Sequence, residues 1–380
     1  MRALFVGGGT GGHINPALAI AGYLRHREPD ARILYIGAKG GMEERLVSAA
    51  GYDFKTITIS GFQRKLTPKN MLRNVQTVSR LFSSVAESKK IIRAFRPDVC
   101  IGTGGYVSGP VIRAAVKLGI PSLLHESNAF PGVTTKMLAK SVDAVLLAVS
   151  DAKQHLPAET NCVLTGNPVR GEVLDAQREQ SRKKLGLDDR PLILSFGGSL
   201  GAKAINTAVC GMLAESAKTK KYQHIHGYGA NDTDFLNRAQ DLGVKLSDNP
   251  QIRLLEYIDD MPTCLSACDL VIGRAGAITL SEIEAKHKAS ILIPSPNVAE
   301  NHQYHNAMVL VRRDAAVLIE EKDLTAEALW NKIEESLGNP KRLSQLSENA
   351  GKMGMTDAGS RIYREIKKAS RRKKHNYLDE

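Results

Sequence analysis

The sequence has few of the features that mark membrane-spanning or secreted proteins. No apolar run approaches the roughly 18 residues that a membrane-spanning helix needs, and Val142–Val149, among the longest, is interrupted by Asp143. The first apolar run, Ala3–Val6, leads straight into glycines, and it is too short for a secretory signal peptide. We therefore expect a cytoplasmic protein that is not an integral membrane protein.

Cysteine is also scarce. The chain of 380 residues has five cysteines, an odd number, and no pair has the C-x2-C spacing of a zinc site. Most of them lie in apolar stretches, so we expect reduced core residues; they are Cys100, Cys162, Cys210, Cys264 and Cys268.

Positive charge is abundant but unevenly distributed. The net charge is +12, and residues 1–160 contain 21 Lys and Arg against 11 Asp and Glu, whereas residues 161–363 are nearly balanced. The rest of the excess lies in the C-terminal tail. The first half is therefore expected to face something anionic, whether nucleic acid, a membrane surface or a phosphorylated substrate.

Apolar runs and helical patterns alternate along the chain. Ala3–Val6 reads as a strand, Gly7–Gly12 as a loop, and Asn15-Pro16 as a helix start, with Asn at the N-cap and Pro at the first helical position. Hydrophobic residues constitute 42% of the chain, which is enough for a substantial core. The alternation predicts an α/β fold with parallel sheets.

The second half repeats this order. Leu192–Phe196 and Gly197–Gly201 form another strand and glycine loop, with a helix from about Ala202, and the pattern Asp-x-x-Ile-Gly-x-x-Gly occurs at both 98–105 and 269–276. Two similar domains in tandem explain this better than chance likeness between βαβ units. Ligands of open α/β sheets bind at the carboxyl ends of the strands, so we expect the two domains to face a cleft.

The join is expected near Thr165–Pro168. We predict a first domain over residues 1–165 and a second over residues 166–364, whose last helix is a candidate to cross back to the first. Residues 365–380 form a basic tail that we expect to be disordered.

The first glycine loop matches G-x-G-x-x-G at Gly7, Gly9 and Gly12, a spacing that brings backbone close to a pyrophosphate. An NAD site would want an acidic residue at the end of the second strand, where residues 37–39 read Gly-Ala-Lys. In the second loop Ser199 adds a hydroxyl. Arg170 and Arg274 lie beside predicted loops, where a guanidinium suits a diphosphate and a surface ion pair is the alternative.

His13 lies between the first loop and the predicted helix. The positive potential of a helix N-terminus disfavours the imidazolium and keeps the ring able to accept a proton. A merely structural role in the loop is the alternative. Further candidates, Glu126, Glu282, His302 and Gln303, form no Ser-His-Asp order and no metal-ligand spacing, so we expect no metal.

These segments together resemble the MurG family, which transfers N-acetylglucosamine to lipid I to make lipid II in peptidoglycan synthesis. The matching segments occur in the family's order: GGGTGGHINPALAIA (7–21), GTGGYVSGP (102–110), HESNAFPG (125–132), TGNPVR (165–170), SFGGSLGA (195–202), YIDDM (257–261), GRAGAITLSE (273–282) and AENHQYHNA (299–307).

The resemblance implies a GT-B fold of two Rossmann-like domains, an inverting mechanism, no cofactor and no required metal. It assigns the donor UDP-N-acetylglucosamine (UDP-GlcNAc) to the second half through Arg170 and Ser199 (diphosphate), Ile258 (uracil), Glu282 (ribose) and Gln303 (sugar). From the first half it implies donor contacts by Thr10, Gly11, Gly12 and Asn128, and acceptor diphosphate loops at Gly9, Gly104, Gly105 and Tyr106. His13 is the candidate base.

The chain departs from the family pattern in three places. Ser127 stands where we would expect Gln, Lys286–Ala289 replaces an expected Gly-Lys-Pro turn, and the basic extension 370–375 is unexplained. Because of the first departure we leave Ser127 out of the predicted site. The change at Lys286–Ala289 puts the expected conformation of that loop in doubt, but not the activity.

A lipid-linked acceptor requires contact with a bilayer. Residues 62–96 contain nine Lys and Arg against one acid, interleaved with apolar residues, which predicts a basic amphipathic helix pair on anionic lipid. The alternative is a core-facing helix with a solvated basic face. We expect peripheral attachment at the cytoplasmic face of the membrane and no nucleic-acid partner.

Rival interpretations are a UDP-GlcNAc 2-epimerase or a diacylglycerol glycosyltransferase of the same fold, and an NAD(P)-dependent oxidoreductase. The sequence argues against the oxidoreductase, because it has no acidic residue at the end of the second predicted strand to bind the ribose of the cofactor. A non-enzymatic nucleic-acid or membrane-binding protein would not explain glycine loops in both halves.

Overall fold

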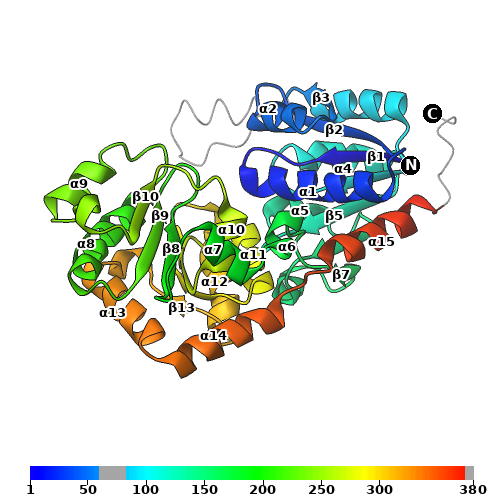
Figure 1. Cartoon of the computed structure of the whole chain (residues 1–380). Helices are drawn as coiled ribbons and strands as arrows, with labels where there is room; N and C mark the ends of the chain where they lie inside the picture. Colours follow the sequence, from blue (N-terminus) through cyan, green and yellow to red (C-terminus); the bar gives the residue numbers. More distant parts are fainter. Residues whose placement is uncertain (60–82, 373–380) are drawn as a thin grey trace. The chain divides into compact units, whose positions relative to one another are not determined.

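A computed structural model describes residues 1–59 and 83–372, which form two compact units (Figure 1). The first unit comprises Met1–Pro168 and Asp357–Glu380, and the second comprises Val169–Thr356. The last helix, α15 (Ala358–Ser370), thus belongs to the first unit rather than to the second, because Ile362 and Ile366 are buried in the core of the first.

The first unit is built on a seven-stranded sheet in which every pairing is parallel, in the order β3-β2-β1-β4-β5-β6-β7. Its strands are short and largely apolar because helices cover both faces. They are β1 (Arg2–Val6), β2 (Arg32–Ala38), β3 (Asp53–Ile57), β4 (Val99–Gly102), β5 (Ser122–Glu126), β6 (Ala144–Leu147) and β7 (Cys162–Leu164).

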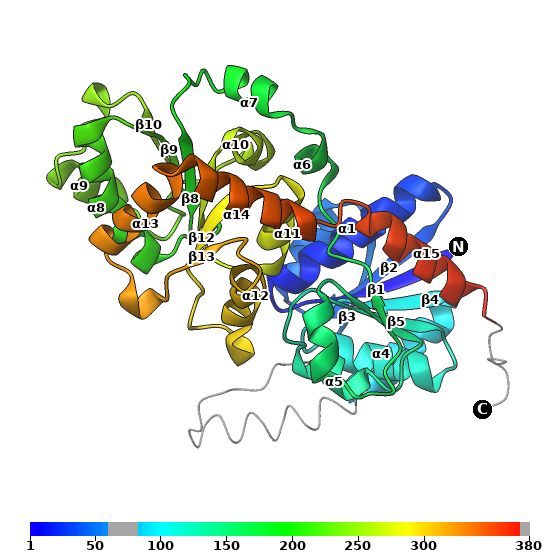
Figure 2. The ribbon, with the colours of Figure 1, turned by 90° about the horizontal axis from the view of Figure 1, so that it is seen from below.

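Alternate residues of β1 face two different cores. Ala3 and Phe5 pack with α1 and α15 on one face, whereas Leu4 and Val6 pack with α4 on the other. Figure 2 shows the sheet between these two helix layers. The helices are α1 (Gly11–Arg27), α2 (Met42–Ala49), residues 83–95, α4 (Ser108–Lys117) and α5 (Val133–Leu138), with a 3-10 turn at Ser150–His155.

Helix α1 begins at Gly11, so the predicted start at Asn15-Pro16 is wrong. Thr10 is the N-cap, and its carbonyl accepts hydrogen bonds from the backbone N–H groups of His13 and Ile14 at 3.1 and 3.2 Å. Pro16 lies inside the helix, where its missing N–H removes one intrahelical bond. His13 therefore belongs to the first helical turn rather than to the preceding loop.

The second unit repeats the architecture with a six-stranded parallel sheet in the order β10-β9-β8-β11-β12-β13. In each unit the first strand is central and the order reverses beside it, as in a Rossmann-like sheet. The strands are β8 (Leu192–Phe196), β9 (Gln223–Gly227), β10 (Ile252–Leu255), β11 (Leu270–Gly273), β12 (Ala289–Leu292) and β13 (Val317–Leu318).

Helices α8 and α13 contribute to the main core of this unit, where Ile205 and Leu329 are fully buried against β8 and β12. The helices are α6 (Gly171–Asp175), α7 (Arg178–Lys184), α8 (Lys203–Thr219), α9 (Phe235–Asp241), α10 (Met261–Ala267), α11 (Ala277–Ala285), α12 (His302–Val311), α13 (Ala326–Leu337) and α14 (Pro340–Met353). Short 3-10 turns occur at Leu246–Asp248, Ala299–Asn301 and Glu321–Asp323.

The repeated Asp of the two halves has one structural role. Asp98 accepts a hydrogen bond from the backbone N–H of Arg2 at 2.7 Å, and Asp269 accepts one from that of Leu192 at 2.8 Å. In both units this carboxylate joins the starts of the two central strands. The motif repeated at 98–105 and 269–276 therefore reflects the same hydrogen bond between strand starts at the amino edge of each sheet.

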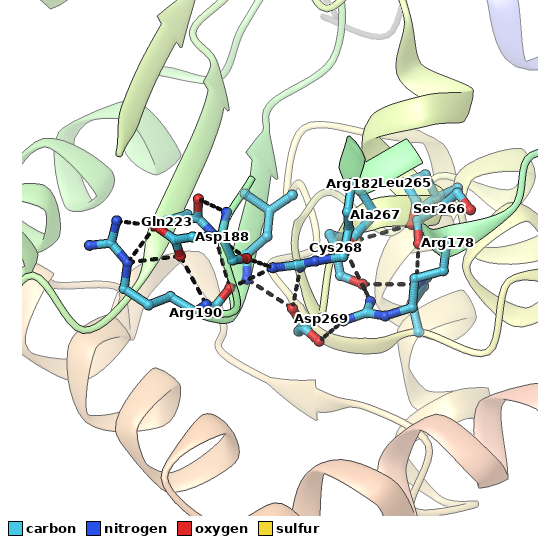
Figure 3. A network of polar contacts seen from close by, with 12 residues as sticks. Arg178, Arg182, Asp188, Arg190, Gln223, Leu265, Ser266, Ala267, Cys268 and Asp269 are labelled. Atoms are coloured by element: carbon cyan, nitrogen blue, oxygen red, sulfur yellow. Dashed lines mark hydrogen bonds and ion pairs between the residues drawn. The ribbon is translucent and has the colours of Figure 1, made fainter. Parts of the chain in front are cut away.

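In the second unit a network of charged groups extends this edge (Figure 3). The guanidinium of Arg178 donates to Asp269 at 2.6 Å and to the carbonyls of Ala267 and Cys268, each at 3.0 Å. Arg182 also donates to Asp269, at 3.4 Å. These bonds satisfy carbonyls at the end of α10, so this network serves the fold.

The basic segment 62–96 is described only from residue 83 onward; residues 60–82 lie outside the described ranges. Within the helix 83–95, Ser84, Ser88 and Ile92 are buried at a four-residue spacing, and Lys90 and Arg93 are exposed. This part is therefore a core-facing helix with a basic outer face. None of the described helices is both long and apolar enough to cross a membrane.

Two buried histidines on β9 make the second unit sensitive to acid. His224 and His226 contact the hydroxyls of Ser216 and Ser195 at 2.6 and 2.8 Å. Burial lowers the pKa of His224 to about 3 and that of His226 to about 4. Because the unfolded chain binds these protons near pH 6.5, their contribution to stability is present above that pH and is lost as the pH falls toward 4.

We predict that His226→Gln reduces the loss of unfolding free energy between pH 7 and pH 5 by about 1–2 kcal/mol, since one proton-binding group has been removed. Urea unfolding at both pH values measures it. His26→Gln, at an exposed position, is the control. Equal pH dependence in the two variants would contradict the prediction.

Candidate functional site

Two glycine loops meet at the carboxyl edge of the first sheet. The N–H of Gly8, after β1, donates to the carbonyl of Gly104, after β4, at 3.4 Å. A Cβ at Gly105 would lie 2.0 Å from the oxygen of Gly8, so a side chain there would force the loops apart. The predicted acceptor loops therefore contact each other and form one surface, with Tyr106 beside Gly9.

His13 is held at this contact by Thr103, the residue that follows β4. Its Nδ1 lies 3.1 Å from the carbonyl oxygen of Thr103, and the hydroxyl of Thr103 donates to the carbonyl of His13 at 2.6 Å. A carbonyl oxygen only accepts, so Nδ1 carries the hydrogen in this contact and the lone pair of the neutral ring is on Nε2. The arrangement supplies an oriented imidazole with Nε2 as its basic atom.

The groups around His13 differ in exposure. Thr10 and Gly12 are exposed at the start of α1, where the first backbone N–H groups of a helix have no intrahelical partner. Tyr106 is half-buried, and burial, with the negative charge of Glu43 as a further cause, raises the pKa of its hydroxyl. A favourable place for an anion in this loop is thus the start of α1.

Glu126, at the end of β5, is a structural carboxylate. It accepts hydrogen bonds from the N–H of Asn128 at 3.1 Å, the N–H of Gly132 at 3.0 Å and the hydroxyl of Thr135 at 2.7 Å. The side-chain amide of Asn128 also donates to it, at 3.1 Å. Glu126 therefore shapes the loop that presents Asn128, and contact between Asn128 and the donor stays a prediction.

In the second unit, Arg170 and Glu282 are direct partners. Arg170 follows the strand and turn that end the first unit, and its Nε donates to Oε1 of Glu282, on α11, at 2.8 Å. The side chain of Glu282 is 8% exposed and that of Arg170 is 49% exposed. The two residues predicted to bind the diphosphate and the ribose are thus held together, and each orients the other.

Arg170 also lines a cavity of about 620 Å³ in this unit. Across it lie Asp259 and Asp260, which follow Ile258 in the loop after β10, and Lys184, which contacts Asp260 at 2.5 Å. Ile258 itself is buried. Arg170, the partner of Glu282, and the loop that directly follows Ile258 therefore line the same cavity.

Ser199 lies exposed in the loop after β8. This loop packs tightly on the loop after β9, because a Cβ at Gly201 would lie 2.1 Å from the carbonyl oxygen of Tyr228. Asn206 holds the same loop by donating to that carbonyl at 2.8 Å. Sequence reasoning missed Asn206, whose side chain is recognisable only from the loop that it supports.

Helix α12 anchors the loops after β11 and β12. The side-chain oxygen of Gln303 accepts from the N–H of Ser295 at 2.9 Å, so its NH2 group is left as the donor for other partners. The amide of Asn306 donates to the carbonyl of Ala275 at 3.3 Å. The two residues before α12, Glu300 and Asn301, have φ of 48° and 52°, a left-handed conformation costly for such residues.

Arg274 is bonded to neighbouring groups of the fold, and contact between its guanidinium and a diphosphate stays a prediction. Its guanidinium donates to the carbonyls of Ile293 and Pro294 at 3.1 and 3.2 Å and pairs with Glu321. Among residues 1–59 and 83–372, no group of three His, Cys, Asp or Glu side chains is arranged to hold a metal ion.

The chain matches known proteins along nearly its whole length. Residues 3–147 match the glycosyltransferase family 28 N-terminal domain, and residues 192–362 match the glycosyltransferase family 28 C-terminal domain. Proteins named UDP-N-acetylglucosamine--N-acetylmuramyl-(pentapeptide) pyrophosphoryl-undecaprenol N-acetylglucosamine transferase are similar. That of Acetivibrio thermocellus is 44% identical over 97% of this chain and 98% of its own, and one from Bacillus thuringiensis is 44% identical over 97% and 99%.

Solved structures agree. A crystal structure of MurG from Acinetobacter baumannii has a TM-score of 0.78 and 28% identity, covering 97% of this chain and 99% of its own. A UDP-GlcNAc 2-epimerase from Neisseria meningitidis, bound to UDP-GlcNAc, has a TM-score of 0.65 at 14% identity, covering 97% of this chain and all of its own. At that identity the second likeness shows the fold alone.

Two Rossmann-like units with glycine loops at their carboxyl edges, matched by both family 28 domains, define a glycosyltransferase of the GT-B fold. The sequence-based expectation of this fold and of a hexosyltransferase is confirmed. Within family 28 the chain belongs to the MurG family. The epimerase alternative is not favoured, because the two relatives described above, at 44% identity, are named as transferases.

Proposed function

We propose that this chain moves N-acetylglucosamine from UDP-GlcNAc to the C4 hydroxyl of the muramoyl sugar of lipid I, with inversion, giving lipid II for peptidoglycan synthesis. The observation that carries the proposal is the oriented His13 on a glycine-loop surface, in a chain 44% identical to transferases of that name. The second unit binds the donor and the first binds the acceptor.

Donor binding is assigned to the paired residues of the second unit. Glu282 accepts hydrogen bonds from the ribose hydroxyls, while Arg170, anchored through Nε, uses its outer nitrogens on the diphosphate. Ser199 adds its hydroxyl, the backbone of Ile258 binds uracil, and the NH2 group of Gln303 donates to the sugar. Thr10, Gly11, Gly12 and Asn128 are the donor contacts proposed from the first unit.

His13 acts as the general base. The acceptor hydroxyl attacks the anomeric carbon, its proton passes to Nε2 of His13, and the bond from that carbon to the UDP oxygen breaks. The Nδ1–H bond to Thr103 stabilises the imidazolium that forms, because the carbonyl dipole faces it. Negative charge on the departing UDP is met by Arg170, Ser199 and helix N-terminal N–H groups.

We further propose peripheral contact with an anionic lipid surface through α5. Val133 and Met137, one helical turn apart, are 58% and 69% exposed, and Lys136 and Lys140 lie on the same short segment. Exposed apolar side chains among lysines suit the boundary of an anionic bilayer. The hydroxyl of Thr134 donates to the carbonyl of Gly105 at 3.3 Å, so this surface adjoins the proposed acceptor loop.

The first test measures UDP release from UDP-GlcNAc with and without a short-chain lipid I analogue, in buffer with chelator. Wild type is expected to release UDP only with acceptor, and His13→Ala is expected to be at least about 100-fold slower because it lacks the base. No acceptor-dependent release by folded wild type would contradict the proposed function.

Two further variants separate the base from a role in loop structure. His13→Asn keeps a donor near the position of Nδ1 for the Thr103 carbonyl but has no group at Nε2. If His13 is the base, His13→Asn is as slow as His13→Ala; near-wild-type activity would assign it to loop structure instead. Unchanged UDP affinity in both variants is the control for folding.

A double-mutant cycle tests the donor assignment. Arg170→Gln and Glu282→Gln should each weaken UDP binding, and their combination should weaken it less than the sum by about 1–3 kcal/mol, since either change removes the orientation of the other side chain. Calorimetric titration with UDP measures the four affinities, those of wild type, the two single variants and the double variant. Lys221→Gln, in an exposed pair with Glu334, should leave UDP affinity unchanged. Additive losses would contradict the pairing.

The membrane contact predicts that Val133→Ser combined with Met137→Gln lowers the partition coefficient onto anionic phospholipid vesicles by about tenfold, through lost apolar burial. Co-sedimentation measures it. Activity on a short-chain soluble acceptor should persist, and Leu242→Gln, exposed in the second unit, should partition like wild type. Unaltered partitioning of the double variant would exclude α5 as the contact.

A further inference from the structure

A carboxylate lies buried beneath the first glycine loop, although the sequence has no acidic residue at the end of β2. Glu43, in the first turn of α2, has no exposed surface. Its Oε1 accepts a hydrogen bond from the N–H of Ala38, the last residue of β2, at 2.9 Å. Its Oε2 accepts one from the N–H of Gly9 at 3.3 Å. The side chain thus joins β2 to the loop.

Three glycines make the space that this carboxylate occupies. A Cβ would lie 2.5 Å from Oε1 of Glu43 if placed on Gly8, 2.5 Å from its Cγ if placed on Gly37, and 2.6 Å from its Cδ if placed on Gly41. These glycines come from three different segments. All three glycines contact the Glu43 side chain, so a larger residue at any of them would displace it.

The hydrogen bond to Glu43 fixes the conformation of the loop at Gly9. Gly9 has φ of +82°, and its N–H points inward to the carboxylate. On the other side of the loop, the buried hydroxyl of Tyr35 donates to the carbonyl of Gly7 at 2.6 Å. The loop is therefore held from β2 and α2 on both sides immediately before Thr10, the N-cap of the helix that carries His13.

We propose that Glu43 is a positioning residue for the transfer reaction: it holds the loop from Gly7 to Thr10 in the conformation that presents His13 to the acceptor. The proposal rests on the function proposed above, in which His13 is the base. It also gives Gly9 a structural part, since its amide donates to Glu43 and not to the acceptor diphosphate.

The chain offers a matched control in the next residue. Glu44 lies in the same helical turn, is exposed, and accepts a hydrogen bond from the N–H of Gly40 at 3.2 Å. Glu43→Gln and Glu44→Gln each remove one negative charge from the start of α2. Only the first places an NH2 group, which cannot accept, against one of the two buried backbone N–H groups.

Glu43→Gln is expected to lower kcat by about 10–100-fold, the effect of misplacing a catalytic group by about 1 Å. The KM for UDP-GlcNAc should change much less than kcat, because most of the proposed donor contacts lie in the second unit and are untouched. Glu44→Gln should match wild type in both. Two results would overturn the proposal. One is an equal kcat in Glu43→Gln and Glu44→Gln, and the other is a rise in the KM for UDP-GlcNAc in Glu43→Gln as large as its fall in kcat.

Hydrogen exchange of the peptide 6–14 provides a readout that does not depend on activity. Exchange should be faster in Glu43→Gln than in wild type and unchanged in Glu44→Gln. Gly8→Ala, which displaces the carboxylate but keeps its charge, should reproduce both the exchange and the kcat change, and it serves if Glu43→Gln fails to fold. If wild type shows no acceptor-dependent release, the proposed function fails; if exchange is also unaffected by Glu43→Gln, the loop assignment fails separately.

Discussion

The candidate active site depends on the close approach of two backbone loops at the carboxyl edge of the first sheet. A Cβ at Gly105 would lie 2.0 Å from the backbone oxygen of Gly8, so that position leaves no room for a side chain without displacement. This approach puts the carbonyl of Thr103 within hydrogen-bonding distance of His13. An imidazole oriented by a backbone carbonyl keeps its tautomer, so the basic nitrogen is defined before any substrate binds.

The parallel sheets of the two units share features at both their amino and their carboxyl edges. At the amino edge an aspartate, Asp98 or Asp269, joins the two central strands. At the carboxyl edge glycines allow loops to pack backbone against backbone, which leaves helix N-termini as places for phosphate groups. The units differ in charge: the first half of the chain carries the positive excess, as suits a unit proposed to meet a lipid-linked diphosphate and an anionic surface.

Carboxylates at these edges act mainly through other groups. Glu126 accepts four hydrogen bonds within one loop, Glu282 orients Arg170, and Glu43 lies under the loop that precedes His13. A buried carboxylate with backbone N–H partners fixes loop geometry more firmly than a neutral acceptor, because charge-assisted hydrogen bonds are stronger.

The sequence by itself determined the parallel α/β architecture, the two glycine loops and the family, because strand periodicity, glycine spacing and motif order are local or ordered features of the chain. It placed the start of α1 five residues too late, since the local Asn-Pro signal was overridden by the contacts of the first turn with Thr103, just after β4. Only the tertiary structure paired Arg170 with Glu282, 112 residues apart, and Glu43 with Gly9, 34 residues apart. Such partners depend on which strands lie side by side, and no local pattern encodes that.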